Sequence, residues 1–184
     1  MNNIKLITDS TCDLPKHIVD KYDIEVIPLI IHINHEQYYD GVDIDTDQLL
    51  ERMKEEETIA STSQINPARF LEIYEGYIKE GYDILSIHLS SNMSGTFQSA
   101  VIARDMLSEG HVTVIDSKNV TSGLGLLVLK AAKLIEEGKA LEEIEKALEE
   151  LKPTIESLLV FESLDNLVKG GRLSKTAGLI GSVL

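Results

Sequence analysis

The chain has 184 residues, of which 43% are hydrophobic and 26% charged, as in ordinary globular proteins. Its net charge of -14 argues against nucleic acid or an anionic membrane surface as a partner, because both require a cationic face. No apolar run approaches the roughly 18 residues of a membrane span. The single cysteine, Cys12, has no partner for an internal disulfide, and no signal-peptide pattern is present. We therefore expect a reducing, cytoplasmic setting.

Strand and helix patterns alternate along the first three quarters of the chain. Short apolar runs predict strands at residues 4–8, 25–33, 84–89 and 111–115. Pro28 removes a backbone donor from the second run, which indicates an edge or irregular strand. Amphipathic spacing and capping residues predict helices at 15–22, 47–56, 67–80, 97–107, 123–137 and 141–151. This alternation predicts an α/β fold with a mostly parallel sheet flanked by helices.

The chain changes character at Pro153. An apolar run at 157–162 predicts one more strand, residues 163–168 favour a helix, and a glycine-rich basic loop follows at 169–175. A unit starting at Pro153 would have about 30 residues, too few to bury a core of its own. We therefore divide the chain into an N-terminal α/β domain, 1–152, and the start of an incomplete second α/β domain, 153–184.

A hydroxyl-rich turn at 90–96 lies between a predicted buried strand and a predicted helix. A helix N-terminus has unpaired N–H groups and partial positive charge, so such a turn can hold an anion with neutral donors. The simpler interpretation is that Ser94 only caps the helix. Other polar stretches leave predicted strands or precede a helix, at 9–11, 61–63 and 116–117. Because ligands of open α/β sheets bind beyond the carboxyl ends of the strands, these stretches predict a site there for a carboxylate or phosphate.

Standard catalytic and metal-binding motifs are absent from the sequence. It contains no G-x-S-x-G elbow, no phosphate-binding P-loop and no zinc spacing among its five histidines. His88 lies within a strand and is interpreted as a core histidine, and Cys12 as an inert thiol. We predict no catalytic residue, no metal and no cofactor.

A basic cluster near the end of the chain consists of Lys169, Arg172 and Lys175. It is either a solvated surface loop or a docking point for an acidic or phosphate-bearing partner. In the second case Arg172 would be the forked donor.

Five segments together resemble the DegV family, the fatty-acid-binding proteins that serve bacterial fatty acid kinase. The segments are Thr-Asp-Ser-Thr-Cys-Asp-Leu-Pro at 8–15, Thr-Ser-Gln at 62–64, Ser-Ser-Asn-Met-Ser-Gly-Thr-Phe-Gln-Ser-Ala at 90–100, Val-Ile-Asp-Ser at 114–117 and Lys-Gly-Gly-Arg-Leu-Ser at 169–174. Each segment alone is weak, but their order and spacing cover nearly the whole chain. The combination makes the resemblance specific.

The resemblance implies a two-domain α/β protein that encloses a long-chain fatty acid and presents its carboxylate to the kinase. The kinase brings ATP and forms an acyl phosphate for phospholipid synthesis, so the binding protein is itself not an enzyme. By the matched motifs, Thr62 and Ser94 hold the carboxylate and Arg172 engages the kinase. Supporting contacts are expected from Ser63, Gly95, Thr96, Asp116 and Ser117. Family members are longer, so the resemblance also implies an incomplete C-terminal lipid-binding domain in this chain.

Two other classes of function remain open. A phosphosugar-binding enzyme, such as an isomerase, could use the same hydroxyl-rich turns for a phosphate. It would need a general base, for which the sequence offers no well-placed residue. A structural or interaction module would have capped helices and no ligand.

Overall fold

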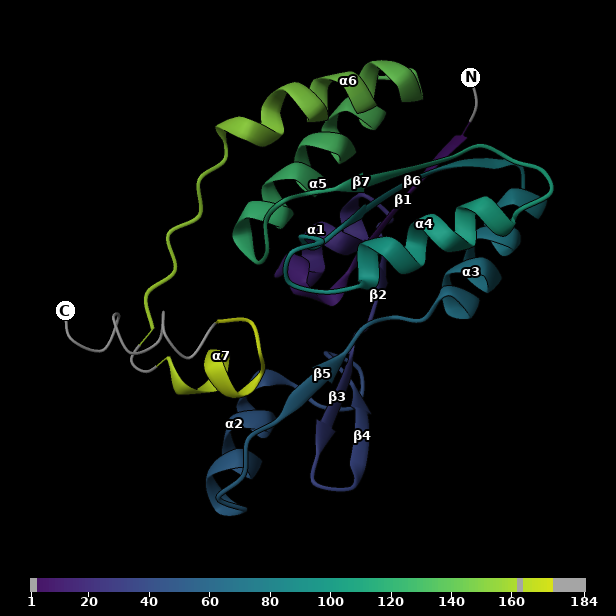
Figure 1. Ribbon diagram of the computed structural model, residues 1–184. Coiled ribbons are helices and arrows are strands. Elements are labelled where there is room, and N and C mark those ends of the chain that lie inside the picture. The colour runs from purple at the N-terminus through teal and green to yellow at the C-terminus, as the bar shows by residue number, and fades with distance from the viewer. Residues whose placement is uncertain (1–2, 162–163, 174–184) are drawn as a thin grey trace.

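The computed structural model describes residues 3–161 and 164–173 and shows a layered α/β unit with a smaller lobe below it (Figure 1). The main sheet of the described chain has the order β2-β1-β6-β7, and its strands are all parallel. The strands are β1 (Asn3–Asp9), β2 (Glu25–Ile27), β6 (Tyr82–His88) and β7 (Val112–Asp116). This confirms the predicted α/β fold and parallel sheet. The carboxyl ends of all these strands therefore meet at one edge.

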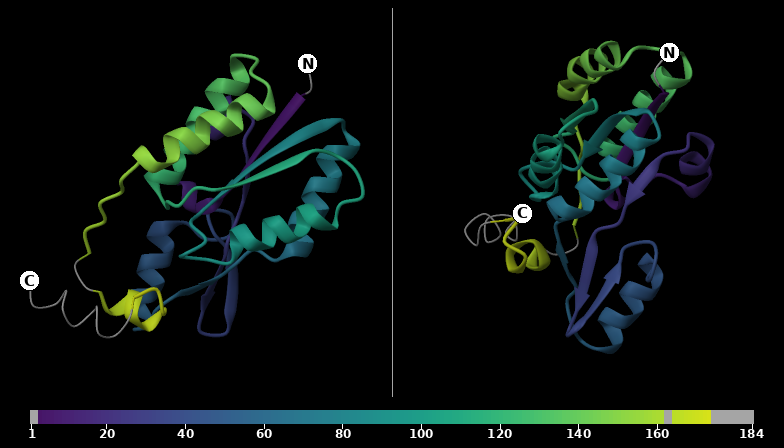
Figure 2. Two further views of the ribbon diagram at one scale, coloured as in Figure 1. Left: turned by 45° about the horizontal axis from the view of Figure 1, so that its top comes forward. Right: turned by 90° about the vertical axis from the view of Figure 1, so that its right-hand side faces the viewer.

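Helices cover both faces of the parallel sheet (Figure 2). One face packs against α1 (Lys16–Lys21), α5 (Ser122–Glu136) and α6 (Leu141–Leu151), and the other against α3 (Pro67–Lys79) and α4 (Thr96–Met106). Successive strand residues point to opposite faces, so Leu6 enters the first core and Ile7 the second. Both side chains are buried, which explains why β1 is an unbroken apolar run.

Close backbone packing places α5 against the turn that follows β1. This turn is a short 3-10 helix, η1 (Ser10–Cys12). A Cβ atom added at Gly125 would lie 2.5 Å from the carbonyl oxygen of Cys12. Only glycine therefore allows the helix to approach this closely.

A second, antiparallel sheet was not predicted. It has the order β4-β3-β5 and consists of β3 (Ile30–Ile33), β4 (Glu36–Tyr39) and β5 (Ser61–Ser63). The single strand predicted at 25–33 is wrong because the chain leaves the parallel sheet at Pro28. Pro28 has no N–H, and the N–H of Leu29 donates to Ser10 Oγ at 3.1 Å. Together with α2 (Thr46–Glu55), this sheet forms the lower lobe around Ile31, Ile33 and Ile44 (Figure 1).

The last described part of the chain runs from α6 through the 3-10 turn η2 (Lys152–Thr154) to α7 (Asp165–Lys169). Residues 157–161 form no strand, so the strand predicted at 157–162 is wrong over its described part. α7 confirms a helix near 163–168, whereas the domain boundary at 153 stays a prediction. Residues 174–184, which include Lys175, lie outside the described residues. No helix in the described ranges has the length and hydropathy to cross a membrane.

Two glycine variants test the packing of α5. Gly125→Ala should lower the free energy of unfolding by about 1–3 kcal/mol, because the added methyl group meets the Cys12 carbonyl. Gly76→Ala in α3 is the matched control, since no atom lies within 4 Å of its added Cβ. It should raise the free energy of unfolding by up to about 1 kcal/mol. Urea titrations measure both changes in the free energy of unfolding. Changes of the same sign in the two variants would contradict the close packing of α5 against Cys12.

Candidate functional site

Three segments that lie far apart in the sequence meet beyond the carboxyl ends of the parallel strands. They are residues 61–65, which contain β5, the turn 90–96 between β6 and α4, and the loop 169–173 after α7. The backbone N–H of Ile65 donates to Thr96 Oγ1 at 3.3 Å, and Arg172 Nε donates to the carbonyl oxygen of Met93 at 3.3 Å. We call this junction the edge site, defined by Thr62, Ser94 and Arg172.

Ser94 lies half-buried in the turn that opens α4. Its Oγ accepts a hydrogen bond from the backbone N–H of Thr96 at 3.3 Å and lies 3.0 Å from Thr96 Oγ1. The first bond satisfies the N–H of the first residue of α4, but Ser94 is not the N-cap predicted from the sequence, because Gly95 occupies that position and has no side-chain cap. Accepting this bond does not use the hydroxyl hydrogen of Ser94, so the same residue can also donate to a ligand.

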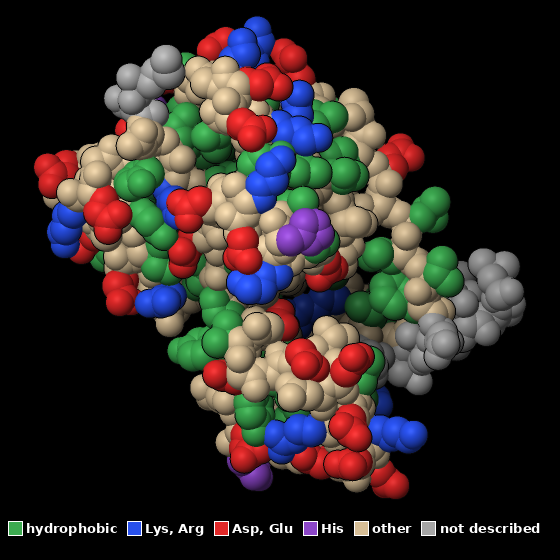
Figure 3. All heavy atoms as spheres, turned by 180° about the vertical axis from the view of Figure 1, so that it is seen from behind, with side chains coloured by type: hydrophobic (Ala, Val, Ile, Leu, Met, Phe, Trp, Pro, Cys, Tyr) green, Lys and Arg blue, Asp and Glu red, His purple; other side chains and the backbone are tan. Residues whose placement is uncertain are grey.

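Thr62 is exposed on β5 and lines a pocket of about 360 Å³ between the lobe and the basic loop. Lys169, Gly170 and Arg172 line the facing wall. Figure 3 shows the surface hollowed between the lobe and the main body, with Lys or Arg atoms deep in the hollow. The structure therefore brings a hydroxyl and cationic side chains to one concave surface of a strongly acidic protein.

Gly95 in the turn lies against the side chain of Gln64 in the Thr-Ser-Gln segment. A Cβ atom added at Gly95 would overlap the side-chain amide of Gln64. That amide donates from Nε2 to Ser99 Oγ of α4 at 3.1 Å. Gln64 is therefore a contact residue to which the sequence had assigned no role.

The other predicted supporting residues have structural partners. Ser63 points to the other face of β5, where its Oγ lies 3.0 Å from His32 Nε2. Asp116 Oδ1 accepts hydrogen bonds from the backbone N–H groups of Ser91, at 3.1 Å, and Lys118, at 3.0 Å. Ser117 is wholly buried. Asp116 therefore holds the turn 90–96 in place.

Asn119 is a second residue that the sequence did not single out. Its carbonyl oxygen accepts from the backbone N–H of Ser90 at 2.8 Å and from Ser117 Oγ at 2.9 Å. Its Oδ1 accepts from Ser157 Oγ at 2.8 Å. Asn119 joins the start of the turn, the end of β7 and the segment before α7. These contacts join residues up to 38 positions apart, so no local sequence pattern predicts them.

A buried polar network lies directly beneath the edge site. Asp9 Oδ2 lies 3.0 Å from His88 Nδ1 and accepts from the N–H of Leu89 at 3.0 Å, while Oδ1 accepts from Thr11 Oγ1 at 2.6 Å. His88 Nε2 lies 2.7 Å from Ser86 Oγ, which accepts from Tyr74 at 2.7 Å. All polar atoms are satisfied when His88 is neutral and protonated on Nδ1.

The hydrogen bonds of this network connect Ser86, His88 and Asp9 in the same order as in a catalytic Ser-His-Asp triad, but a substrate has no access to them. The side chains of Asp9, Ser86 and His88 are each 0% exposed. Burial alone raises the pKa of Asp9, yet the hydrogen bonds from His88, Thr11 and Leu89 outweigh burial and hold the pKa below its usual range. The network therefore stabilises the edge of the sheet, as expected for a core histidine.

Burial raises the pKa of the Cys12 thiol to about 11, so it stays protonated at neutral pH. Within the described residues, no group of three or more His, Cys, Asp and Glu side chains could hold a metal ion.

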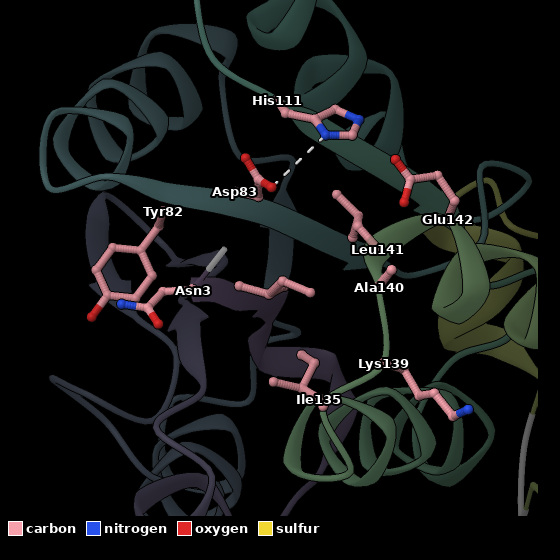
Figure 4. A pocket seen from close by; sticks show the side chains of 11 residues that line it. Asn3, Tyr82, Asp83, His111, Ile135, Lys139, Ala140, Leu141 and Glu142 are labelled. Atoms are coloured by element: carbon pink, nitrogen blue, oxygen red, sulfur yellow. Dashed lines mark ion pairs between the residues drawn. The ribbon is translucent and has the colours of Figure 1, made fainter. Parts of the chain in front are cut away.

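A larger pocket, of about 600 Å³, lies at the opposite, amino-terminal edge of the sheet (Figure 4). Asn3 and Tyr82 line it, and the ion pair between Asp83 and His111 spans 4.0 Å. None of the predicted site residues belongs to this pocket. Size alone therefore does not identify the site.

Comparison with known proteins identifies the family. The family model described as "Uncharacterised protein, DegV family" matches residues 3–184. The chain belongs to the DegV family. One DegV relative, a DegV domain-containing protein of Clostridium perfringens, is 55% identical over 184 residues, which are 100% of this chain and 66% of that protein.

Solved DegV structures share the fold. DegV from Bacillus subtilis, described as a fatty acid binding protein, matches with a TM-score of 0.91 at 36% identity, over 100% of this chain and 66% of that one. A fatty-acid-binding DegV family protein from Thermus thermophilus matches with a TM-score of 0.87 at 33% identity, over 100% of this chain and 65% of that one. The chain thus spans slightly less than two thirds of the length of these relatives.

The Asp9 network predicts how the stability of this DegV chain depends on pH. Asp9→Asn should lower the free energy of unfolding at pH 7 by about 2–3 kcal/mol, because hydrogen bonds to a buried carboxylate are lost. The folded-state pKa of Asp9 is depressed. Ionised Asp9 therefore stabilises the fold above the unfolded pKa of about 4, and this contribution is lost as the pH falls further. The difference in free energy of unfolding between the wild type and Asp9→Asn should be constant from pH 7 to about 5 and shrink below about 4.

Urea titrations across this pH range measure the effect. The control is Asp20→Asn on the exposed surface of α1, which should change stability by less than about 0.5 kcal/mol. An Asp9→Asn variant as stable as the control would show that the buried carboxylate does not hold the edge of the sheet.

Proposed function

We propose that this protein binds a long-chain fatty acid, holds its carboxylate with the hydroxyl groups of Thr62 and Ser94, and presents it to a fatty acid kinase. The observation that carries the proposal is the junction of residues 61–65, 90–96 and 169–173 at the carboxyl edge of the sheet. Two DegV structures that match the whole chain are described as fatty-acid-binding proteins. The proposal extends that activity to this chain.

Neutral donors suit a carboxylate that must later react. A hydroxyl or backbone N–H donates to the anion without adding a full countercharge. A lysine paired with the carboxylate would hold it more firmly but would also shield it from phosphorylation. The cationic Lys169 and Arg172 line the wall that faces Thr62, where an incoming phosphate-bearing partner would arrive. The protein itself then needs no catalytic nucleophile.

The acyl chain supplies most of the binding free energy in this proposal. An acyl chain of about 16 carbons gains about 0.8 kcal/mol for each buried CH₂, or about 10 kcal/mol in total before costs. Association and ordering remove several kcal/mol of this. The head-group contacts therefore mainly fix the position of the carboxylate relative to the kinase.

Removing the hydroxyl donors tests the carboxylate assignment. Thr62→Ala and Ser94→Ala should each weaken palmitate binding about 10-fold, because one hydrogen bond to a charged group is lost. Titration calorimetry gives the dissociation constants, and native mass spectrometry shows whether the purified protein carries a long-chain acid.

Ser108→Ala is the matched control, since Ser108 lies in the exposed loop between α4 and β7, and it should leave the affinity unchanged. Unchanged affinity in a Thr62→Ala, Ser94→Ala double variant would remove the assigned role of both residues. A protein that purifies without lipid, does not bind palmitate and turns over sugar phosphates would favour the phosphosugar enzyme instead.

Replacing Arg172 tests the kinase contact. Arg172→Ala should change palmitate affinity by less than about 3-fold but lower kinase-dependent acyl-phosphate formation at least about 10-fold. The guanidinium lies at the surface, where Nε and Nη1 donate to the carbonyl oxygens of Met93 and Gly170. Arg172→Lys should not restore the rate, because an ammonium group lacks the planar fork. Acyl-phosphate formation at the wild-type rate in Arg172→Ala would contradict this role.

A further inference from the structure

Thr96 is the residue through which the two halves of the edge site touch. It is the first residue of α4, and its side chain is 0% exposed. Its Oγ1 accepts a hydrogen bond from the backbone N–H of Ile65 at 3.3 Å and lies 3.0 Å from Ser94 Oγ. One buried hydroxyl group therefore bonds both to the segment that carries Thr62 and to Ser94.

The direction of the bond between the two hydroxyl groups follows from their remaining partners. If Ser94 donated to Thr96, Thr96 Oγ1 would accept two hydrogen bonds, and its own buried hydrogen would have no acceptor among the described residues. An unsatisfied buried donor is costly. If Thr96 donates to Ser94, both atoms are satisfied. The second arrangement is therefore favoured.

This direction decides what Ser94 can do for a ligand. Ser94 Oγ then accepts from both the N–H and the Oγ1–H of Thr96, so both of its lone pairs are occupied. Its one hydrogen then has no acceptor among the hydrogen bonds of the turn and stays available to a ligand. Ser94 can act only as a donor, which suits an ionised carboxylate and not a head group that must itself donate.

We infer that Thr96 is a positioning residue that orients the Ser94 hydroxyl toward the fatty-acid carboxylate. The inference rests on the proposed function. It also revises the expectation that Thr96 supports the carboxylate directly, because its buried side chain acts through Ser94.

A double-mutant cycle tests the inference in the purified protein, with palmitate as the probe. Thr96→Val keeps the shape of the side chain but removes its hydroxyl, and it should weaken palmitate binding about 10-fold. Thr96→Ser restores the hydroxyl and should return the affinity to within about 3-fold of wild type. In a Ser94→Ala background, Thr96→Val should change the affinity by less than about 2-fold, because its effect passes through Ser94.

Thr113→Val is the matched control. It removes another buried threonine hydroxyl, in β7, that makes no hydrogen bond to the edge site among the described residues. It should leave palmitate affinity unchanged. Thermal unfolding confirms that each variant is folded, and if Thr96→Val does not fold, Thr96→Cys, a weak donor of similar size, takes its place in the cycle.

The outcomes separate this inference from the proposed function. Wild-type affinity in Ser94→Ala would mean that the proposed carboxylate contact itself is wrong. Two results would overturn only the role of Thr96, provided that Ser94→Ala weakens palmitate binding. One is wild-type palmitate affinity in Thr96→Val. The other is a loss of affinity in the double variant that equals the product of the two single losses. Failure of Thr96→Ser to restore the affinity would overturn it as well.

Discussion

The buried carboxylate of Asp9 is the interaction on which the site-bearing edge of the sheet depends. It joins the ends of the two central strands, because its partners are Thr11 after β1 and His88 and Leu89 at the end of β6. A buried charge is tolerated only when such donors surround it. The turn that carries Ser94 begins directly after Leu89. Its starting point is therefore fixed by a contact between residues 80 positions apart.

Beyond Leu89, successive hydrogen bonds position the segments of the edge site. Asp116 accepts a hydrogen bond from the N–H of Ser91, Ser94 Oγ accepts from the N–H of Thr96, and Thr96 Oγ1 accepts from the N–H of Ile65. These contacts join three loops, and Lys118 Nζ reinforces the first of them, since it lies 2.6 Å from Asp116 Oδ2 and donates to Ser91 Oγ at 3.1 Å. A protein with a net charge of -14 thus presents hydroxyl and backbone N–H donors at this edge, while Lys169 and Arg172 line a facing wall.

Prediction from the sequence succeeded where the pattern was local and failed where a partner strand decided the outcome. The parallel strands and most helices follow from apolar periodicity and caps, such as the Asn66 side chain that accepts from the N–H of Arg69. At Pro28 the apolar run continues while the chain changes sheets. At 157–161 the run is equally apolar, yet Leu158 and Val160 are 95% and 96% exposed. A strand exists only when another strand pairs with it, and the described chain places none beside this segment.

The sequence by itself determined the α/β class, the polar turns at the strand ends and, through its motifs, the membership of the DegV family. Through the motifs that resemble the DegV family, it also singled out Thr62, Ser94 and Arg172, which lie in hydroxyl-rich and glycine-rich stretches of the chain. Only the tertiary structure decided that the segments carrying these residues meet and that Asn119, Gln64 and Asp9 hold the segments in place. Hydrogen bonds between residues 25 to 80 positions apart leave no local periodicity, so only the folded chain shows them.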